Sequence, residues 1–349
     1  PARSSRTHAP SIYVPFLFAV YTFEKSIPDQ IYVKAGEAID YQFQVPVTME
    51  IQEDSSPVAK STNNANVRQS YIVTCRLFGI FPVKDIEVVL VDGDAVYAGG
   101  MPIGIYVKTR GVLVIGTSEV ERPDGSEAAP AENILKAGDY ILSVNGEKVA
   151  EKEDLQRLVQ QNGAEKEILK INRKGEEVEV GVTPVQNKNG TYMLGAWVRD
   201  DLAGIGTLTY YKEDGTYGAL GHAVSDGDVG ERIQMREGYV YKAQIIGVKK
   251  GQKGNPGELS GMIRYQSADC LGTIEENTDI GIYGKLDGNI AALPRGDYYN
   301  ICYKQDIKQG PATIICGFTG EKKEYAIEIE SLDYSGREAN KGILFWVTD

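Results

Sequence analysis

His222 is the residue of this chain best suited to acid–base chemistry. It lies in the run from Tyr217 to Asp226, between small residues and a Ser-Asp-Gly-Asp turn, where an imidazole ring can face a cleft. Imidazole exchanges protons near neutral pH more readily than other side chains. The other histidine of the chain, His8, belongs to a basic N-terminal tail. His222 is therefore the candidate general base, and the alternative is a core or turn histidine that makes one hydrogen bond.

Metal and cofactor chemistry have little support in the residue pattern. The four cysteines have no Cys-x-x-Cys or Cys/His ligand spacing, which argues against a zinc site. A metal held by Asp226, Asp228 and Glu231 is conceivable, but this spacing fits no calcium loop. Asp226 and Asp228 are alternatively ring-orienting neighbours of His222, or solvated carboxylates of a turn. We expect no metal and no cofactor.

The number and spacing of the cysteines do not decide between an oxidising and a reducing compartment. Cys302 and Cys316 are close enough in sequence to pair in an oxidising compartment. The alternative, which we favour, is that the cysteines are free, buried and apolar.

Size and charge exclude some classes of protein. At 349 residues and 42% hydrophobic residues, the chain is long enough for two or three domains with real cores. The net charge of -12 argues against nucleic acid as a partner, because a phosphate backbone requires a basic surface.

The first part of the chain predicts an export or anchor segment in residues 1–27 and a small β module in residues 28–92. A basic flank precedes an apolar run over residues 11–23, as in a signal sequence or signal anchor. The run is shorter than the roughly 18–20 residues of a spanning helix, and the alternative is a buried strand. No small-residue cleavage site follows it, which favours an anchor. Residues 53–69 are polar and predict an exposed loop.

Residues 95–186 resemble a PDZ domain. The run from Leu135 to Val149 contains the Gly-Asp and Asn-Gly turn pairs of that family, with apolar residues between them. An amphipathic helix over 153–159 and a hairpin over 167–180 complete the pattern. The resemblance implies that a peptide binds as an added strand and that a loop holds its C-terminus by backbone N–H groups. The loop that matches is formed by Met101, Pro102, Ile103, Gly104 and Ile105. The alternative is a spacer domain without a ligand.

Residues 196–349 predict a third, all-β unit. Short apolar runs alternate with turn residues, and long helical patterns are scarce. This spacing is typical of a β-barrel or a β-sandwich.

Five runs extend the resemblance to one family. They are Asp200–Thr209, Tyr217–Asp226, Lys253–Glu258, Gly310–Ala312 and Asn340–Asp349. They closely resemble the stage IV sporulation protein B family, the PDZ-containing serine peptidases of endospore-forming bacteria. The family belongs to the chymotrypsin-like clan, which implies a mainly β fold with a chymotrypsin-like β-barrel peptidase domain, incomplete here at its C-terminus. By the family's motifs, His222 matches the general base. Asp349 matches the aspartate that accepts the other ring N–H and stabilises the imidazolium.

The nucleophile of that family is absent from this sequence. The family carries it in a Gly-Met-Ser-Gly-Ser-Pro run beyond the aspartate, and no such run occurs here. Ser260 is a weak substitute, because its Gly-Met neighbours lack the usual context, and Ser225 is too close in sequence to His222. Either the chain is a piece of a longer enzyme or it has lost catalysis. The run from Gly342 to Val347 predicts a buried strand, and a chain ending at its tip would leave an unpaired apolar edge, which favours the first explanation.

The resemblance implies an extracytoplasmic serine endopeptidase, membrane-anchored or secreted, that acts between forespore and mother cell. It would cleave a membrane-bound regulator in a sporulation checkpoint and cleave itself near its N-terminus. The PDZ domain would dock a peptide or inhibit the enzyme. The chain as printed is expected to be inactive, since it lacks the serine. The alternative is a non-catalytic PDZ adaptor or pseudopeptidase.

Overall fold

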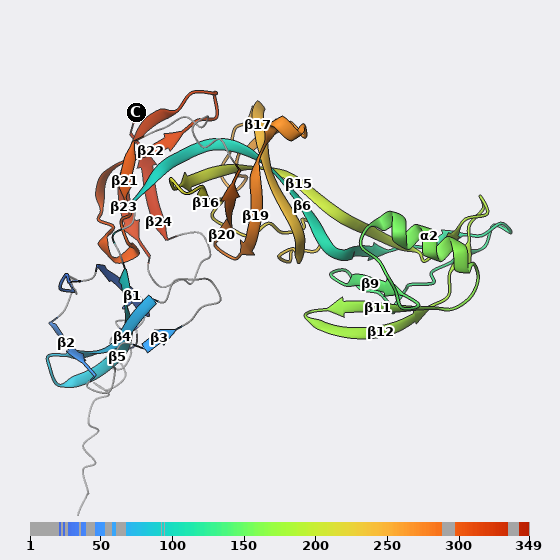
Figure 1. Cartoon of the computed structure of the whole chain (residues 1–349), viewed down its shortest axis with the longest axis horizontal. Coiled ribbons are helices and arrows are strands. Elements are labelled where there is room, and N and C mark those ends of the chain that lie inside the picture. The colour runs from blue at the N-terminus through green and yellow to red at the C-terminus, as the bar shows by residue number, and fades with distance from the viewer. Residues whose placement is uncertain are drawn as a thin grey trace, which may run out of the picture. The chain divides into compact units, whose positions relative to one another are not determined.

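The computed structural model describes most of the chain (Figure 1). The described residues are 21, 24, 27–34, 36–39, 46–52, 58–60, 68–91, 93, 95–287, 297–333 and 342–348. The tail and export-like run of residues 1–20 and most of the predicted 53–69 loop lie outside these ranges. Among the described residues, no helix is both long and apolar enough to span a bilayer. The fold is mainly β, as the sequence predicts.

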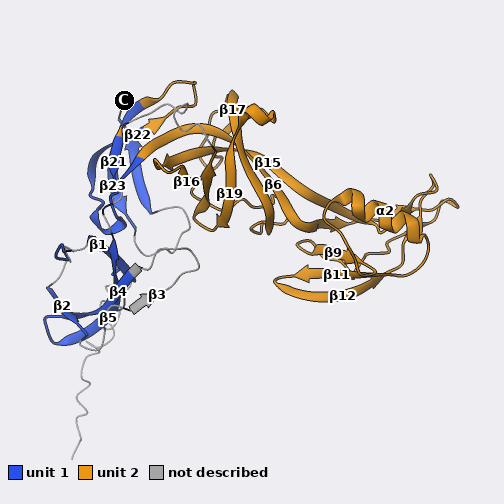
Figure 2. Ribbon diagram, in the orientation of Figure 1, with its two compact units in different colours: residues 1–96, 298–314, 324–349 blue, residues 97–297, 315–323 orange. Residues whose placement is uncertain are grey.

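The chain divides into two compact units (Figure 2). Unit 1 contains residues 1–96, 298–314 and 324–349, and unit 2 contains residues 97–297 and 315–323. The domain boundaries derived from the sequence stay predictions.

Unit 1 contains a sheet with the strand order β1-β5-β4-β2, and β3 also pairs with β4. These strands are β1 (Gln30–Lys34), β2 (Val47–Ile51), β3 (Val58–Lys60), β4 (Arg68–Leu77) and β5 (Phe81–Val91). β1 runs parallel to β5, and the other pairs are antiparallel. Because alternate side chains of a strand point to one face, one face of the sheet builds an apolar core that includes Ile31, Val73, Cys75 and Ile86.

A second, three-stranded sheet has the order β22-β23-β24 and belongs mostly to unit 1. Its strands are β22 (Gly310–Cys316), β23 (Lys323–Leu332) and β24 (Ile343–Val347). The sequence correctly predicts β24 as a strand, but its predicted burial is wrong, because its side chains are 39 to 62% exposed. Among the described residues, β24 is an edge strand that pairs only with β23, and its side chains stay exposed.

Unit 2 begins with strands that build the PDZ-like core. These are the second half of β6 (Ala95–Thr117), then β9 (Tyr140–Val144), β11 (Glu167–Arg173) and β12 (Glu176–Val182). The helix α2 (Lys152–Asn162) packs on them with Leu155, Leu158 and Val159. Short strands complete this part: β7 (Val120–Glu121), β8 (Glu127–Ala128), β10 (Glu147–Lys148), β13 (Val185–Gln186) and β14 (Tyr192–Met193).

Local sequence explains this part well. Gly138, Asn145 and Gly146 take positive φ, as the predicted turns require. The carboxylate of Asp139 is buried and receives two hydrogen bonds from Arg173, at 2.8 and 2.7 Å. Arg173 thereby locks the Gly-Asp turn to β11, since a two-point guanidinium–carboxylate pair fixes both position and orientation.

The rest of unit 2 is a cycle of paired strands around a second core. The order β6-β15-β16-β20-β19-β17 returns to β6, because β17 also pairs with β6, and β18 extends β17. The strands are β15 (Ala196–Tyr211), β16 (Thr216–Ala219), β17 (Met235–Lys249), β18 (Glu258–Ile263), β19 (Cys270–Thr278) and β20 (Gly281–Leu286). Ile105, Leu208, Tyr217, Val240 and Ile282 are among the buried residues inside. The chymotrypsin-like barrel itself stays a prediction.

The predicted carboxylate-binding loop differs from the structure. Met101, Pro102, Ile103, Gly104 and Ile105 are not a loop but the middle of β6. Gly104 pairs with Ile205 of β15 on one side and with Tyr241 of β17 on the other. The backbone here is committed to two neighbouring strands, so it cannot receive a peptide carboxylate in the predicted way.

Candidate active site

The candidate site is the loop that follows β16. The strand ends at Ala219, and the next residue, Leu220, takes a φ of +66° and donates its N–H to the carbonyl of Thr207. A side chain at positive φ is rare and turns the chain sharply out of the strand. Gly221 and His222 therefore lie on the surface, and both are exposed.

The imidazole of His222 hydrogen-bonds to the backbone. Its Nδ1 lies 2.8 Å from the carbonyl oxygen of Ala223. A carbonyl oxygen only accepts, so this contact assigns the proton to Nδ1 and leaves the Nε2 lone pair to accept a proton. Within the described part of the chain, no carboxylate or serine hydroxyl hydrogen-bonds to the ring. His222 thus has the tautomer of a general base, held by a carbonyl instead of an acid.

Asn277 fixes the residues next to His222. Its Oδ1 accepts the N–H of Val224 at 2.8 Å, and its Nδ2 donates to the carbonyls of Val224 at 2.9 Å and Ile233 at 3.2 Å. The side chain comes from the end of β19 and closes the two arms of the loop. Asn277 is not recognisable in the sequence as a site residue, because it lies 53 residues beyond Val224 and no local pattern marks it.

Asp226 organises the far end of the loop. Its Oδ1 accepts the N–H groups of Asp228 and Val229, and its Oδ2 pairs with Arg199 of β15. Asp226 is buried, whereas Asp228 is exposed and pairs with Arg199 at 3.2 Å. Neither carboxylate hydrogen-bonds to His222. The expectation of two solvated carboxylates is therefore wrong for Asp226, because burial of its charge is compensated by the guanidinium and two amides.

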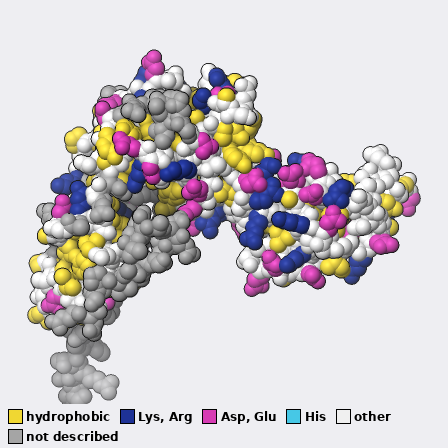
Figure 3. Space-filling view, in the orientation of Figure 1, with side chains coloured by type: hydrophobic (Ala, Val, Ile, Leu, Met, Phe, Trp, Pro, Cys, Tyr) yellow, Lys and Arg dark blue, Asp and Glu magenta, His cyan; other side chains and the backbone are white. Residues whose placement is uncertain are grey.

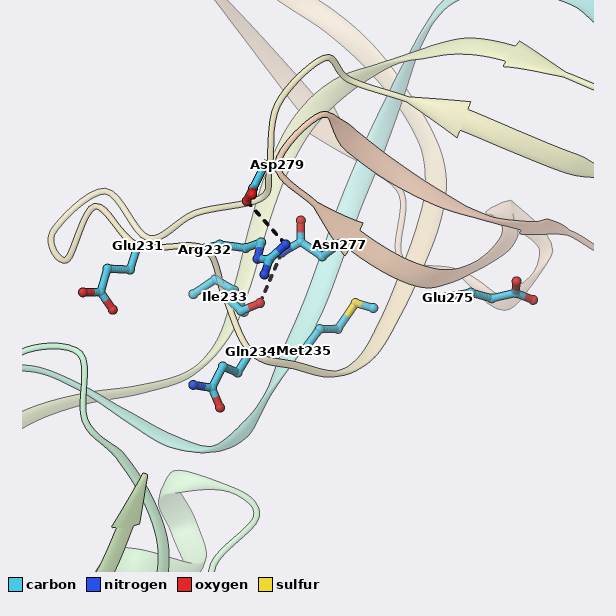
Figure 4. Close-up of a pocket in the computed structure, with 8 residues that line it drawn as sticks. All are labelled: Glu231, Arg232, Ile233, Gln234, Met235, Glu275, Asn277 and Asp279. Carbon is cyan, nitrogen blue, oxygen red and sulfur yellow. Dashed lines mark hydrogen bonds and ion pairs between the residues drawn. The ribbon is translucent and has the colours of Figure 1, made fainter. Parts of the chain in front are cut away.

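A pocket of about 530 Å³ adjoins this loop (Figure 4). Its carboxylates are Glu231, Glu275 and Asp279, and Asp279 pairs with Arg232 at 3.4 Å. Figure 4 shows the Asn277 side chain reaching Ile233 next to that pair. Asn277 therefore holds both the wall of the pocket, through Ile233, and the histidine loop, through Val224.

Of the remaining candidate residues, the structure describes the two serines but not Asp349. Asp349 lies outside the described residues, so its predicted role stays a prediction. Ser260 is exposed on β18, where it pairs with Gly247. Ser225 forms a backbone bridge with Arg232.

The described residues contain neither a metal-binding cluster nor a disulfide. No group of three or more His, Cys, Asp or Glu side chains there could hold a metal ion, including the set of Asp226, Asp228 and Glu231. All four cysteines are free. Cys75 is buried as expected, but Cys302 is exposed.

Comparison with known families adds to this geometry. A PDZ domain model matches residues 123–173, and the model of the SpoIVB peptidase S55 matches residues 190–349. These two matches support a PDZ-containing protein of the serine-peptidase class at the level of the family. Residues 190–349, which include His222 and Asn277, match the SpoIVB peptidase S55 model, and the resemblance seen in the sequence is confirmed.

Two further comparisons were made. No curated protein matches the chain. Among solved structures, the PDZ domain of an SdrC-like protein from Listeria monocytogenes is similar, with 18% identity and a TM-score of 0.22. The match covers 26% of this chain and 87% of that domain.

Proposed function

We propose that this protein is an extracytoplasmic serine endopeptidase that performs regulatory proteolysis in a sporulation checkpoint. The observation that carries the proposal is the peptidase family match over the part of the chain that presents His222. The PDZ domain and the peptidase domain together indicate a protein or peptide substrate. A membrane-bound regulator and the protein itself are the substrates we propose.

The chemistry would run through Nε2 of His222. The nucleophilic serine, from a segment that the printed sequence does not include, would give its proton to Nε2 as its oxygen attacks the substrate carbonyl. The imidazolium would then protonate the leaving amine. The Nδ1–H bond to Ala223 holds the tautomer that this step requires. In the complete enzyme Asp349 would take over or reinforce that contact.

The location is also a proposal. An anchor in residues 11–23 would hold the protein on the outer side of a membrane, in the space between forespore and mother cell. The polar run over residues 53–69 is the proposed site of self-cleavage.

The test is His222→Ala in the full-length protein. Fragments of self-cleavage should disappear, and labelling by a fluorophosphonate, which requires an activated serine, should fall by about a thousandfold or more. Ser225→Ala is the matched control on the same loop and should keep both signals. Unchanged fragments in the His222 variant would show that the proposed base is wrong.

A second candidate function is a PDZ adaptor or pseudopeptidase without catalysis. It is favoured by the lack of any serine hydroxyl at the His222 ring among the described residues. If the full-length wild-type protein is not labelled by a fluorophosphonate but binds peptides, this candidate replaces the first.

A further inference from the structure

A second cavity of unit 2 lies between the PDZ-like strands and the start of β17. It has a volume of about 620 Å³ and is separate from the histidine loop. β9, β10, β11 and β12 form one side, and Met235 and Arg236 form the other. Its charged lining consists of the four cations Arg110, Lys148, Lys170 and Arg236 and one anion, Glu177. In a chain with a net charge of -12, this local excess of positive charge is unusual.

Arg110 is presented from a rigid bend of β6. Its N–H donates to the carbonyl of Gln234 at 2.8 Å, and the buried hydroxyl of Thr109 bonds to the carbonyls of Gly111 and Asp200. Gly111 has a φ of +87°, and a Cβ there would lie 2.5 Å from the carbonyl oxygen of Ile141. The backbone that carries Arg110 therefore has little freedom, which lowers the entropic cost of using this side chain in binding.

Two of the four cations form no ion pair or hydrogen bond with the described residues, although the charge of Arg110 acts on Glu177. Lys170 pairs with Glu177 at 2.6 Å, and Arg236 lies 3.6 Å from Glu151 and 3.4 Å from Glu237. The side chains of Arg110 and Lys148 are exposed and make no ion pair or hydrogen bond with described residues. The pKa of Glu177 is lowered, first by its hydrogen bond to Lys170 and further by the charge of Arg110.

Figure 3 shows Lys and Arg side chains gathered over the region of β9, β11 and β12. Apolar lining accompanies the cations, because Leu142, Val149 and Met235 also face the cavity. The Nε of Arg236 is buried and makes no hydrogen bond, and the carboxylate of Glu237 lies 3.4 Å from it. Charge and apolar surface side by side suit a ligand that carries carboxylates next to apolar groups better than a small inorganic anion.

We propose that this cavity is a binding site for an acidic peptide segment, in which Arg110 and Lys148 receive carboxylates and Leu142 and Met235 contact neighbouring apolar side chains. The site is distinct from strand addition to β6, whose edges are occupied by β9, β15 and β17. The proposal is also independent of catalysis at His222, because the experiment that tests it measures only the binding of a peptide.

The test uses the 349-residue chain and a fluorescein-labelled peptide of Glu, Leu and Gly, read by fluorescence anisotropy. The same peptide with Gln in place of Glu should bind at least about tenfold more weakly. Arg110→Ala combined with Lys148→Ala should weaken binding of the Glu peptide about tenfold, and added NaCl should weaken binding to the wild type.

The matched control is Lys250→Ala with Lys253→Ala, which removes the same charge from exposed residues outside the cavity. This variant should bind the Glu peptide as the wild type does. Three results would overturn the proposal: equal binding of the Gln peptide, an equal loss in the control variant, or inorganic phosphate binding as tightly as the Glu peptide.

Discussion

At the scale of single residues, the histidine loop depends on contacts that only the folded chain creates. His222 is recognisable from its neighbours in the sequence, since small residues and a turn surround it. Asp226 is not recognisable as buried, because its cation partner Arg199 lies on another strand, 27 residues earlier. A charged residue in a Ser-Asp-Gly-Asp run is usually solvated, and its burial follows only from tertiary pairing.

Arg199→Ala tests this buried pair. The substitution leaves the Asp226 carboxylate buried with only two amide donors, so the free energy of unfolding should fall by about 3 kcal/mol, measured by urea titration. Arg232→Ala removes an exposed ion pair with Asp279 and should cost less than about 1 kcal/mol. Equal losses in the two variants would contradict the role given to Asp226.

At the scale of elements, the PDZ-like part was the most predictable. Its turns use dipeptides whose conformational preference is local, so Gly138 and the Asn145–Gly146 pair mark the strand ends directly. The hairpin of β11 and β12 and the helix α2 were also predicted correctly. The error at Met101–Ile105 arose because the sequence does not reveal that β6 continues for 23 residues between two partner strands. Pairing between distant strands has no short sequence signal.

Gly111→Ala tests the bend of β6. Alanine at Gly111 would need both a positive φ and space that the carbonyl of Ile141 occupies, so we expect a loss of about 3 kcal/mol in the free energy of unfolding. Gly146 has nearly the same φ, +85°, with nothing within 4 Å of a Cβ. Gly146→Ala should therefore cost about 1 kcal/mol, from backbone strain alone. If both variants lose the same amount, the close approach at Gly111 is not what requires glycine.

At the scale of the whole molecule, length and hydrophobic content predict several domains with cores, and the strand-like runs predict a mainly β fold. Three buried clusters are present in the described residues. The grouping of the C-terminal strands β23 and β24 with the N-terminal module was not foreseen. Nor was the exposure of β24, since an apolar run predicts burial only when another element covers it. In both cases the sequence does not show which other element, if any, packs against these strands.

The stability of unit 1 should depend on pH through Cys75. Burial first, and the charge of Asp85 second, raise the pKa of this thiol to about 11 from an ordinary value of 9.0. The folded state therefore keeps the thiol protonated longer than the unfolded state does. Its contribution is complete below pH 9 and is lost as the pH rises toward about 11.

Chemical unfolding of the wild type between pH 8 and about 11 should show a fall in stability that Cys75→Ala lacks. A thiol reagent at neutral pH should label the exposed Cys302 well before Cys75. Parallel pH profiles of the two proteins would contradict this assignment.

The long strands β6 and β15 pass without interruption from the PDZ-like core into the second core of unit 2. The PDZ-like part is therefore not a domain that can be exchanged independently of the rest of unit 2. Replacing it with a homologous domain would cut both β6 and β15 in the middle of their pairing. A chimera should therefore be joined outside the two ends of the β6–β15 pair. Recombination in this lineage should leave the whole of unit 2 intact more often than it shuffles its parts.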